Sequence, residues 1–431
     1  MSIAFEKLVE LFGAEAVGTF AAATGRPAWL AGVPVVAPAT LAAACEVLRY
    51  ATRERLAVLP AGAGEHLGGL SPAGAGLGGV DFVLSARRLA RVVEYEPEEM
   101  VLVAEAGVPL RALAALAAPH AQRLPCDVWP GQAATLGGAV AANRAGLDRL
   151  RRGTLRDAVL GVRVVHADGS TSKTGGKVVK NVTGFDLAKL YVGSRGTLAW
   201  LAEVNLRLVP RPPAAALVVA IVERLRAEEL LLGLHRSPLV PTAWLALAGE
   251  VCDAIAVPEG SVGLVARFEG NEAAVRWQVS EAVRQSGGEE WPAERADSTY
   301  EALCASIEPR TGAVSLRVAS LGVGALRVLE CFEGLSAWSR GGGLLAQFGT
   351  GIAQGLLPGD LTGSELRALR ASLVSQGARL EVEAGPPALV QALAGDREAL
   401  DPVASDLYRR TKLAYDPAGI FPPVTVGGGW L

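Results

Sequence analysis

The chain has 431 residues, half of them hydrophobic, and its 41 basic and 44 acidic side chains leave a formal net charge of −3 at pH 7. A chain of this length and composition is expected to fold into two or three globular domains with a large buried core. The nearly balanced charge excludes the strongly basic surface of a nucleic-acid-binding protein and the polybasic patch of a membrane-surface protein.

The N-terminal 20 residues show an amphipathic helical pattern, without the basic region, apolar core and cleavage site of a signal peptide. The longest apolar run, residues 214–222, is far shorter than the ~20 residues that a membrane-spanning helix needs. We therefore expect a cytoplasmic protein, in contact with a membrane at most peripherally and through partner subunits.

The five cysteines lie far apart and show none of the paired spacings of zinc or iron–sulfur sites. We expect them to be small buried side chains in a reducing compartment, and we expect no bound metal. They are Cys45, Cys126, Cys252, Cys304 and Cys331.

The N-terminal part predicts a compact α+β lobe. Between residues 33 and 59, a strand, a helix over 40–52 and a second strand alternate as in a βαβ unit. The following loop, 61–79, is rich in glycine. A strand over 80–86, two more strands joined by an acidic turn at 96–99, and a helix complete this lobe.

The next part begins with the small-residue run ATLGGAVAAN at 134–143. An apolar strand over 159–167 leads into a hairpin turn at Asp168-Gly169-Ser170, and residues 195–209 predict another apolar strand. The run Arg211-Pro212-Pro213 cannot continue a central strand or a helix, so it predicts a domain boundary.

Beyond this boundary, strands and helices alternate through two rounds. This order predicts an antiparallel sheet with helices on one face, in a second, lid-like domain. A final helix is expected over 404–413.

Three short motifs give the chain a family resemblance. Residues 180–186 read KNVTGFD, residues 193–198 read GSRGTL and residues 416–421 read DPAGIF. With the glycine-rich loops, they resemble the FAD-linked oxidase superfamily of the vanillyl-alcohol-oxidase or PCMH type, and within it the FAD-binding subunit of bacterial glycolate oxidase. The resemblance runs from about residue 33 to the C-terminus.

The resemblance implies an α+β fold with a two-lobed PCMH-type FAD-binding domain and a cap domain built from an antiparallel sheet and helices. The C-terminal helix is expected to return to the FAD-binding domain. The implied boundaries are 1–212 for the FAD-binding domain, with lobes over about 1–125 and 126–212, then 213–395 for the cap and 396–431 for the C-terminal segment.

FAD carries a diphosphate, which proteins hold with backbone N–H groups on tight glycine turns. The resemblance implies two such loops, a third segment around the ribityl chain and flavin ring, and a fourth along the flavin and over the adenine. The implied contacts are Pro60, Ala61, Gly62, Ala63, Gly64, Glu65 and His66; Pro130, Gly131, Ala134, Thr135, Leu136, Gly137 and Gly138; Gly153, Thr154 and Asp157; and Gly184, Asp186, Gly196, Trp200, Leu201 and Val204.

Two of the glycine-containing segments have an alternative interpretation. The third segment, taken alone, is typical of a simple turn before a strand. The match Gly74-x-Gly76-x-x-Gly79 to the dinucleotide fingerprint follows a turn and leads into a strand, so we reject a Rossmann interpretation.

The chain departs from the family pattern at both ends of the expected site. The first loop carries Glu65 where the family has Ser or Thr, and a carboxylate repels a diphosphate, so we expect Glu65 to point away. Trp200 replaces a smaller residue and either stacks on the adenine or narrows its slot. Some relatives tether the flavin through a histidine in the position that Glu65 occupies, so we expect non-covalent FAD despite the neighbouring His66.

Oxidation of a 2-hydroxy acid needs a base, most often histidine, and a cation for the carboxylate. The catalytic flavoproteins of the family carry a histidine-rich cap segment that this chain lacks. Only His235 lies in the cap, at a helix end where a surface role is favoured; the other histidines are His66, His120 and His166. Lys180, Arg409 and Lys412 are the weak candidates for holding a substrate or meeting negative charge, and Lys180 has a simple surface charge as its alternative.

Three functional hypotheses follow. The first is an FAD-binding subunit of a glycolate oxidase or D-2-hydroxy-acid dehydrogenase complex, which supports or relays electrons beside a homologous catalytic flavoprotein subunit and an iron–sulfur subunit. The second is a self-sufficient FAD-dependent oxidoreductase acting on a hydroxy acid or alcohol. The third is a structural scaffold that has lost FAD.

Overall fold

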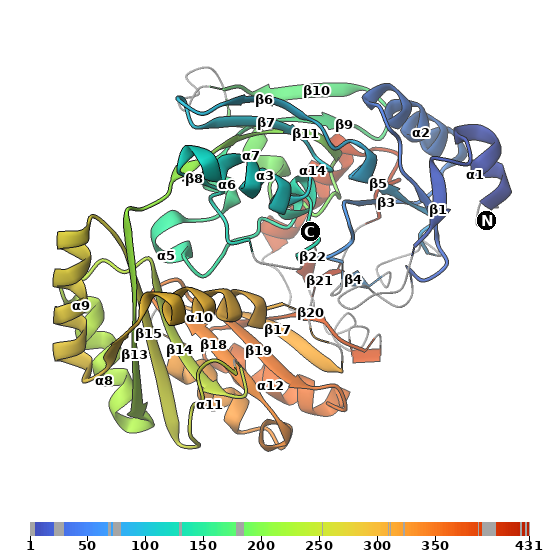
Figure 1. Ribbon diagram of the computed structural model, residues 1–431. Helices are drawn as coiled ribbons and strands as arrows, with labels where there is room; N and C mark the ends of the chain where they lie inside the picture. The colour runs from blue at the N-terminus through green and yellow to red at the C-terminus, as the bar shows by residue number, and fades with distance from the viewer. Residues whose placement is uncertain are drawn as a thin grey trace. The chain divides into compact units, whose positions relative to one another are not determined.

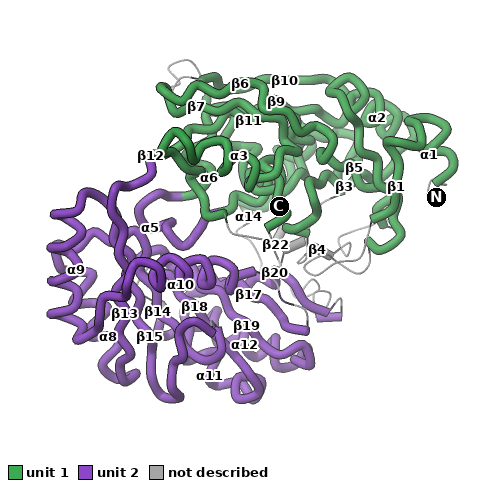
Figure 2. The backbone as a smooth tube through the Cα atoms, in the orientation of Figure 1, with its two compact units in different colours: residues 1–144, 154–210, 390–431 green, residues 145–153, 211–389 purple. Residues whose placement is uncertain are grey.

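The computed structural model describes residues 5–20, 30–67, 70–71, 79–128, 132–177, 185–251, 253–308, 310, 312–321, 324–386, 388–389, 402–422, 425–426 and 429–430. The chain has an α+β fold, as predicted, and divides into two compact units (Figure 2). Unit 1 comprises residues 1–144, 154–210 and 390–431, and unit 2 comprises residues 145–153 and 211–389.

The first sheet of unit 1 contains a βαβ unit (Figure 1). Strands β1 (Val17–Thr19), β2 (Pro34–Val36), β5 (Phe82–Ser85) and β3 (Val58–Ala61) follow the order β1-β2-β5-β3, and β5 is parallel to both β2 and β3. Helix α2 (Leu41–Glu54) connects β2 to β3 and begins where the Thr40 hydroxyl accepts a hydrogen bond from the Ala43 N–H at 3.1 Å. The strand, helix and strand predicted between residues 33 and 59 are thus confirmed.

The second sheet of unit 1 has five antiparallel strands. They are β10 (Thr171–Gly175), β9 (Val159–Val165), β11 (Trp200–Arg207), β7 (Val101–Glu105) and β6 (Val92–Glu96), in the order β10-β9-β11-β7-β6. The central strand, β11, pairs with β9 on one side and β7 on the other. Its buried Val204 and Leu206 belong to a core cluster shared with Phe82 and Leu84 of β5, so one core joins the two sheets.

These pairings divide unit 1 differently from the lobes expected from sequence. The sequence pattern places β6 and β7 in a lobe that ends near residue 125, but β7 pairs with β11 from Glu105 opposite Glu203 to Val101 opposite Arg207. Antiparallel pairing between segments so far apart leaves no local signature in the sequence. The predicted lobe boundary therefore does not follow the sheets.

Short elements complete unit 1. They are helices α1 (Phe5–Phe12), α3 (Leu110–Ala117), α4 (Leu136–Ala141), α6 (Leu155–Ala158), α7 (Ala188–Tyr191) and α14 (Pro402–Tyr415), the 3₁₀ turns η2 (Ala86–Arg88) and η3 (Ala118–His120), the pair β8 (Gln122–Arg123) and β12 (Val209–Pro210), and the small sheet of β4 (Leu70–Ser71), β21 (Thr425–Val426) and β22 (Gly429–Trp430).

Unit 2 is built on an eight-stranded antiparallel sheet, as predicted for the second domain. In spatial order its strands are β16 (Glu289–Trp291), β13 (Ala214–Glu223), β15 (Ser261–Gly270), β14 (Ala243–Gly249), β18 (Gly343–Gln347), β19 (Ile352–Pro358), β17 (Ala313–Ala319) and β20 (Arg379–Ala384). Its helices are α5 (Arg149–Arg152), α8 (Arg224–Arg236), α9 (Glu272–Ser286), α10 (Ala293–Ser306), α11 (Ala325–Glu333) and α12 (Gly363–Ser375), with the turn η4 (Trp338–Arg340).

Helices cover both faces of this sheet. Leu234 of α8 and Ser286 of α9 line a small cavity with Leu264 of β15, which places these helices on one face. The ring of Tyr300, on α10, lies 4.0 Å from the guanidinium of Arg267, three residues further along β15. Because side chains alternate along a strand, α10 packs on the opposite face. The expectation of helices on one face is wrong for α10.

Buried ion pairs explain why residues 145–153 join unit 2. The Arg152 guanidinium donates to Glu269 at 2.6 Å and pairs with Asp148 at 2.6 Å. Glu269 also accepts a hydrogen bond from Arg267 at 3.1 Å. The Glu269 side chain is only 3% exposed, so these charges are well paired within the protein. Such buried pairs determine geometry more than they add stability.

Three further findings concern the part of the chain that the structure describes. Within it, no helix combines the length and the apolarity needed to cross a membrane. His, Cys, Asp and Glu side chains form no group of three or more around a possible metal position there. Cys45, Cys126, Cys304 and Cys331 are buried and are not in disulfides; Cys252 lies outside the described residues.

The C-terminal helix α14 returns to unit 1, as predicted, and is fixed there by a buried ion pair. The Lys412 ammonium donates to the carbonyls of Thr197 and Phe421, each at 2.6 Å, and to Asp416 at 2.5 Å. Asp416, 1% exposed, also accepts from the N–H groups of Ile420 at 3.1 Å and Phe421 at 2.9 Å. Burial lowers the pKa of Lys412, whereas the Asp416 carboxylate opposes this shift.

Replacement of Asp416 by Ala is expected to lower the free energy of unfolding by about 3–5 kcal/mol, because it leaves the Lys412 ammonium without its counter-charge. Urea denaturation measures this change. Asp406→Ala, within α14, is the matched control: Asp406 pairs with Arg409 at 2.5 Å, but both side chains are about half exposed. It is expected to lose about 1 kcal/mol or less. Equal losses from the two variants would contradict a structural role for the Asp416 pair.

Candidate functional site

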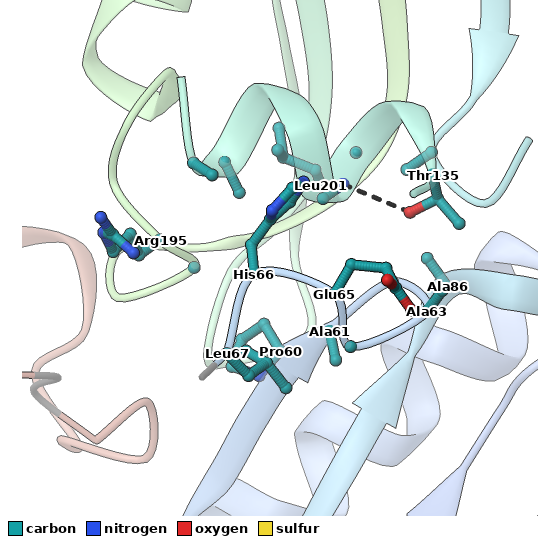
Figure 3. A pocket seen from close by; sticks show the side chains of 18 of the residues that line it. Pro60, Ala61, Ala63, Glu65, His66, Leu67, Ala86, Thr135, Arg195 and Leu201 are labelled. Carbon is teal, nitrogen blue, oxygen red and sulfur yellow. Dashed lines mark hydrogen bonds between the residues drawn. The ribbon is translucent and has the colours of Figure 1, made fainter. Parts of the chain in front are cut away.

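A pocket in unit 1 is lined by three separate stretches of chain (Figure 3). Its empty space is about 660 Å³, a volume that includes the part open to solvent. The stretches are 60–67 after β3, 134–142 around α4, and 195–201 leading into β11, and Ala86 and Ala106 complete the lining. The three stretches come together although they are widely separated in sequence.

Glycines allow these stretches to approach one another closely. A Cβ atom on Gly62 would lie 2.0 Å from the hydroxyl of Thr135, which joins the first stretch to the second. A Cβ on Gly196, where φ is 78°, would lie 2.7 Å from Pro60, which joins the third stretch to the first. Any larger residue at these positions would push the walls of the pocket apart.

Most backbone N–H groups at the start of α4 donate hydrogen bonds within the protein. The N–H groups of Leu136 and Gly137 donate to backbone carbonyls of the 106–108 segment at 2.9 and 2.7 Å. The Gly138 N–H donates to the Thr135 hydroxyl at 3.4 Å, which caps the helix. In this hydrogen bond the Thr135 hydroxyl oxygen is the acceptor. The hydroxyl proton of Thr135 therefore stays available for donation to a ligand.

The 62–66 loop, by contrast, still has backbone donors to offer. Within the described part of the chain, the N–H groups of Ala63, Gly64 and His66 donate to no residue. Gly64 has a φ of 91°, which turns the chain sharply between its neighbours. Successive N–H groups around such a turn form a concave site for anions. This loop can therefore hold a phosphate through its backbone.

His66 extends from this loop toward α4 (Figure 3). Its Nε2 atom is buried and has no hydrogen-bond partner among the described residues, although the side chain as a whole is partly exposed. Burial lowers the pKa of His66 well below 6.5, and the charges of Arg144 and Arg195 lower it further. The imidazole is thus neutral at neutral pH and has one nitrogen available for a ligand in the pocket.

Trp200 is part of the core as well as of the pocket wall. The residue is 2% exposed, and its indole N–H donates to the Leu84 carbonyl at 3.2 Å. The indole is therefore held against β5, and the pocket remains open beside it.

All predicted contacts of the first segment line the pocket, as do some of those in the second and fourth segments, whereas those of the third segment do not. The predicted contacts among the lining residues are Pro60, Ala61, Gly62, Ala63, Gly64, Glu65, His66, Ala134, Thr135, Gly137, Gly138, Gly196, Trp200 and Leu201. Leu136 and Val204 are fully buried in the core instead. Pro130, Gly131, Lys180 and Gly184 lie outside the described residues.

The third segment has a local structural role. The Thr154 N–H donates to the Asp157 carboxylate at 2.8 Å, and the Thr154 hydroxyl donates to it at 3.2 Å, so the pair caps α6. Gly153 belongs to unit 2, and Asp186 is an exposed residue 4.0 Å from Lys189. None of these four is among the described lining residues.

The two cationic candidates on α14 also lie outside the pocket lining. Arg409 is exposed and pairs with Asp406, and Lys412 uses its donors on Thr197, Asp416 and Phe421. Both side chains are thus occupied by contacts within unit 1.

The pocket also contains residues that are not among the predicted contacts: Leu67, Ala86, Ala106, Ala141, Ala142, Arg195 and Ala199. The small apolar members carry no signal in the sequence, because alanine serves equally well in a core. Arg195 could have been found, since it lies within the GSRGTL motif between two glycines. Glu65 lines the pocket, and in Figure 3 its carboxylate and Arg195 lie on opposite sides of His66.

A glycine-lined pocket with an anion-binding loop and an apolar wall defines a cofactor-binding domain. The profile of the family described as "FAD binding domain" matches residues 34–175, which include the first two stretches of the pocket. Residues 34–175 therefore match an FAD-binding domain, as the motifs predict.

Curated proteins similar to the chain are flavoenzyme subunits and dehydrogenases. The chain is 42% identical over 125 residues to glycolate oxidase subunit GlcE of Escherichia coli, which covers 29% of this chain and 36% of that protein. It is 32% identical over 194 residues to glycolate oxidase subunit GlcD of Bacillus subtilis, covering 45% and 40%. D-lactate dehydrogenase of Archaeoglobus fulgidus is 35% identical over 179 residues, covering 41% and 39%. These matches span less than half of each relative.

Solved structures resemble the chain over nearly its whole length. Two structures of alkyldihydroxyacetonephosphate synthase superimpose with TM-scores of 0.67 and 0.66, each covering 96% of this chain and 83% or 84% of the other. The sequence identities are 16% and 14%. At this identity the likeness concerns the fold, which includes both units.

His66 is expected to make the flavin-free protein less stable at acid pH. Because its pKa is lowered in the folded state, the unfolded chain binds the proton more readily as the pH falls below 6.5. Stability is therefore lost toward acid pH, by up to about 1.4 kcal/mol per pH unit. In His66→Gln this loss is expected to disappear.

Unfolding free energies of the two proteins at about pH 8 and pH 5.5 measure the effect. At about pH 8, the difference in unfolding free energy between the wild type and His66→Gln reflects the change in packing. The further change in this difference at pH 5.5 reflects protonation of His66. The same difference at both pH values would contradict a neutral, buried His66.

Proposed function

We propose that this chain binds FAD non-covalently and is the FAD-binding subunit of a glycolate oxidase or D-2-hydroxy-acid dehydrogenase complex, where it supports or relays electrons. Its partners would be a homologous flavoprotein subunit that oxidises the substrate and an iron–sulfur subunit. Bound FAD supplies the capacity to accept and pass on electrons. We expect the complex in the cytoplasm, with membrane contact only through partner subunits.

The observation that carries this proposal is the fit of the pocket to FAD. The backbone donors of the 62–66 loop and the Thr135 hydroxyl are suited to a diphosphate, and the unpartnered His66 nitrogen faces the same pocket. Trp200 and the alanines supply an apolar wall for flat rings. Glu65 occupies the place at which a tethering histidine would stand, which supports non-covalent binding.

The supporting role is inferred from the positions of the described histidines, of which His66 alone lines the pocket. An efficient general base has a pKa near the working pH, whereas burial holds the pKa of His66 well below 6.5. In unit 2, His235 is exposed and lies edge-on to Phe348, with the ring centres 5.6 Å apart. The occupied donors of Lys412 also argue against a substrate-holding role for it.

Purification of the chain alone separates the three hypotheses. A yellow protein, absorbing at about 450 nm, that is not bleached by glycolate, D-lactate or D-2-hydroxyglutarate supports the proposed role. A yellow protein bleached by one of these acids would be a self-sufficient oxidoreductase. A protein that stays colourless after incubation with FAD would be a scaffold, and the proposed function would be wrong.

The proposed position of FAD predicts the effect of Gly138→Val. A Cβ on Gly138 would make one tight contact, 3.3 Å from the Thr135 hydroxyl, and would lie 3.9 Å from the His66 ring. The added methyl groups occupy the pocket, and FAD binding is expected to weaken by about 1–3 kcal/mol, or roughly 5- to 150-fold. Fluorescence titration with FAD measures the change.

Gly18→Val is the control for this experiment, because a Cβ on Gly18, in β1, meets nothing within 4 Å. It is expected to bind FAD like the wild type. If Gly138→Val keeps its circular dichroism spectrum and binds FAD with unchanged affinity, the pocket is not the FAD site.

A further inference from the structure

Arg195 stands in a backbone conformation that favours glycine. It lies in the turn between α7 and β11, where Gly193 and Gly196 have φ values of 82° and 78°. Arg195 has a φ of 51° in the same turn. Gly or Asn would adopt this conformation with less strain, so the backbone does not explain why an arginine stands here.

The surrounding contacts determine where this turn lies. The N–H groups of Gly193 and Arg195 donate to the carbonyls of Val140 and Ala141 at 3.1 and 2.9 Å, at the end of α4. The carbonyl of Thr197 accepts from the buried ammonium of Lys412 at 2.6 Å. The turn is thus held on both sides, which positions Arg195 in the wall of the pocket.

The pocket needs a cation if it binds FAD. The diphosphate is the anionic part of FAD, and most backbone donors at the start of α4 are already used within the protein. Glu65 adds a carboxylate to the lining, and the lowered pKa of His66 leaves its imidazole uncharged. Among the described lining residues, Arg195 is the one that brings a positive charge.

We propose that the guanidinium of Arg195 binds the diphosphate of FAD and offsets the carboxylate of Glu65. Arg195 then determines the affinity of the pocket for ligands that carry a diphosphate. This inference rests on the proposed FAD binding. Guanidinium suits this role because its planar N–H groups match phosphate oxygens and it stays charged at any working pH.

The variant Arg195→Asn tests the inference. Asparagine tolerates the left-handed region, so the flavin-free protein is expected to melt no lower than the wild type. The Kd for FAD, measured by calorimetry on the flavin-free full chain, is expected to rise about 10- to 100-fold. The Kd for ADP, which carries a diphosphate, is expected to rise by the same factor, whereas that for adenosine stays unchanged. Arg195→Lys is expected to recover part of the loss.

Arg55→Asn is the matched control. Arg55 is also an arginine in the left-handed region, with a φ of 55°, at the end of α2. It belongs to unit 1 but is absent from the described pocket lining. The same substitution in the same backbone conformation is therefore expected to leave the affinities for FAD, ADP and adenosine as in the wild type.

The possible results test the role of Arg195 and the proposed FAD binding separately. Loss of FAD and ADP affinity with retained adenosine affinity supports Arg195 as the diphosphate cation. Unchanged FAD affinity in Arg195→Asn, or an equal loss for adenosine, overturns the inference but leaves FAD binding in place. If the wild-type chain binds no FAD, the proposed function is wrong, and the inference falls with it.

Discussion

Close approach of backbone segments is the constraint on which the site depends. Gly62 lies against Thr135, and Gly196 lies against Pro60, at distances that leave no room for a Cβ atom. These two contacts bring three stretches of chain to one pocket, where the N–H groups of Ala63, Gly64 and His66 have no acceptor in the described part of the chain. The pocket is therefore formed by the absence of side chains as much as by their presence.

The rest of unit 1 maintains this arrangement. The central strand β11 pairs with β7 and β9 and carries Trp200, whose indole is anchored to Leu84 of the other sheet. Lys412 and Asp416 attach the C-terminal helix to Thr197, next to the third stretch of the pocket. Contacts remote from the pocket in sequence thus set the position of its walls, which is the usual requirement for a preorganised binding site.

The pocket is lined by charged side chains as well as by glycine-rich backbone. Glu65 places a carboxylate in the lining and Arg195 a guanidinium, while His66 stays neutral because it is buried near two arginines. A diphosphate in this pocket would meet both backbone donors and a fixed cation. These charges support the proposed binding of FAD.

The sequence by itself determined the α+β class, the antiparallel second domain, the FAD-linked oxidase likeness and most of the first two pocket segments, because strand periodicity and glycine-rich motifs are local signals. Only the tertiary structure decided that β7 pairs with β11, that α10 packs on the second face of its sheet, and that Thr154 and Asp157 cap a helix away from the pocket. Those outcomes depend on contacts between distant segments, which leave no trace in the order of residues. For the same reason, the sequence does not identify Ala86 and Ala106 as pocket residues, because an alanine that lines a pocket and an alanine in a core look alike in sequence.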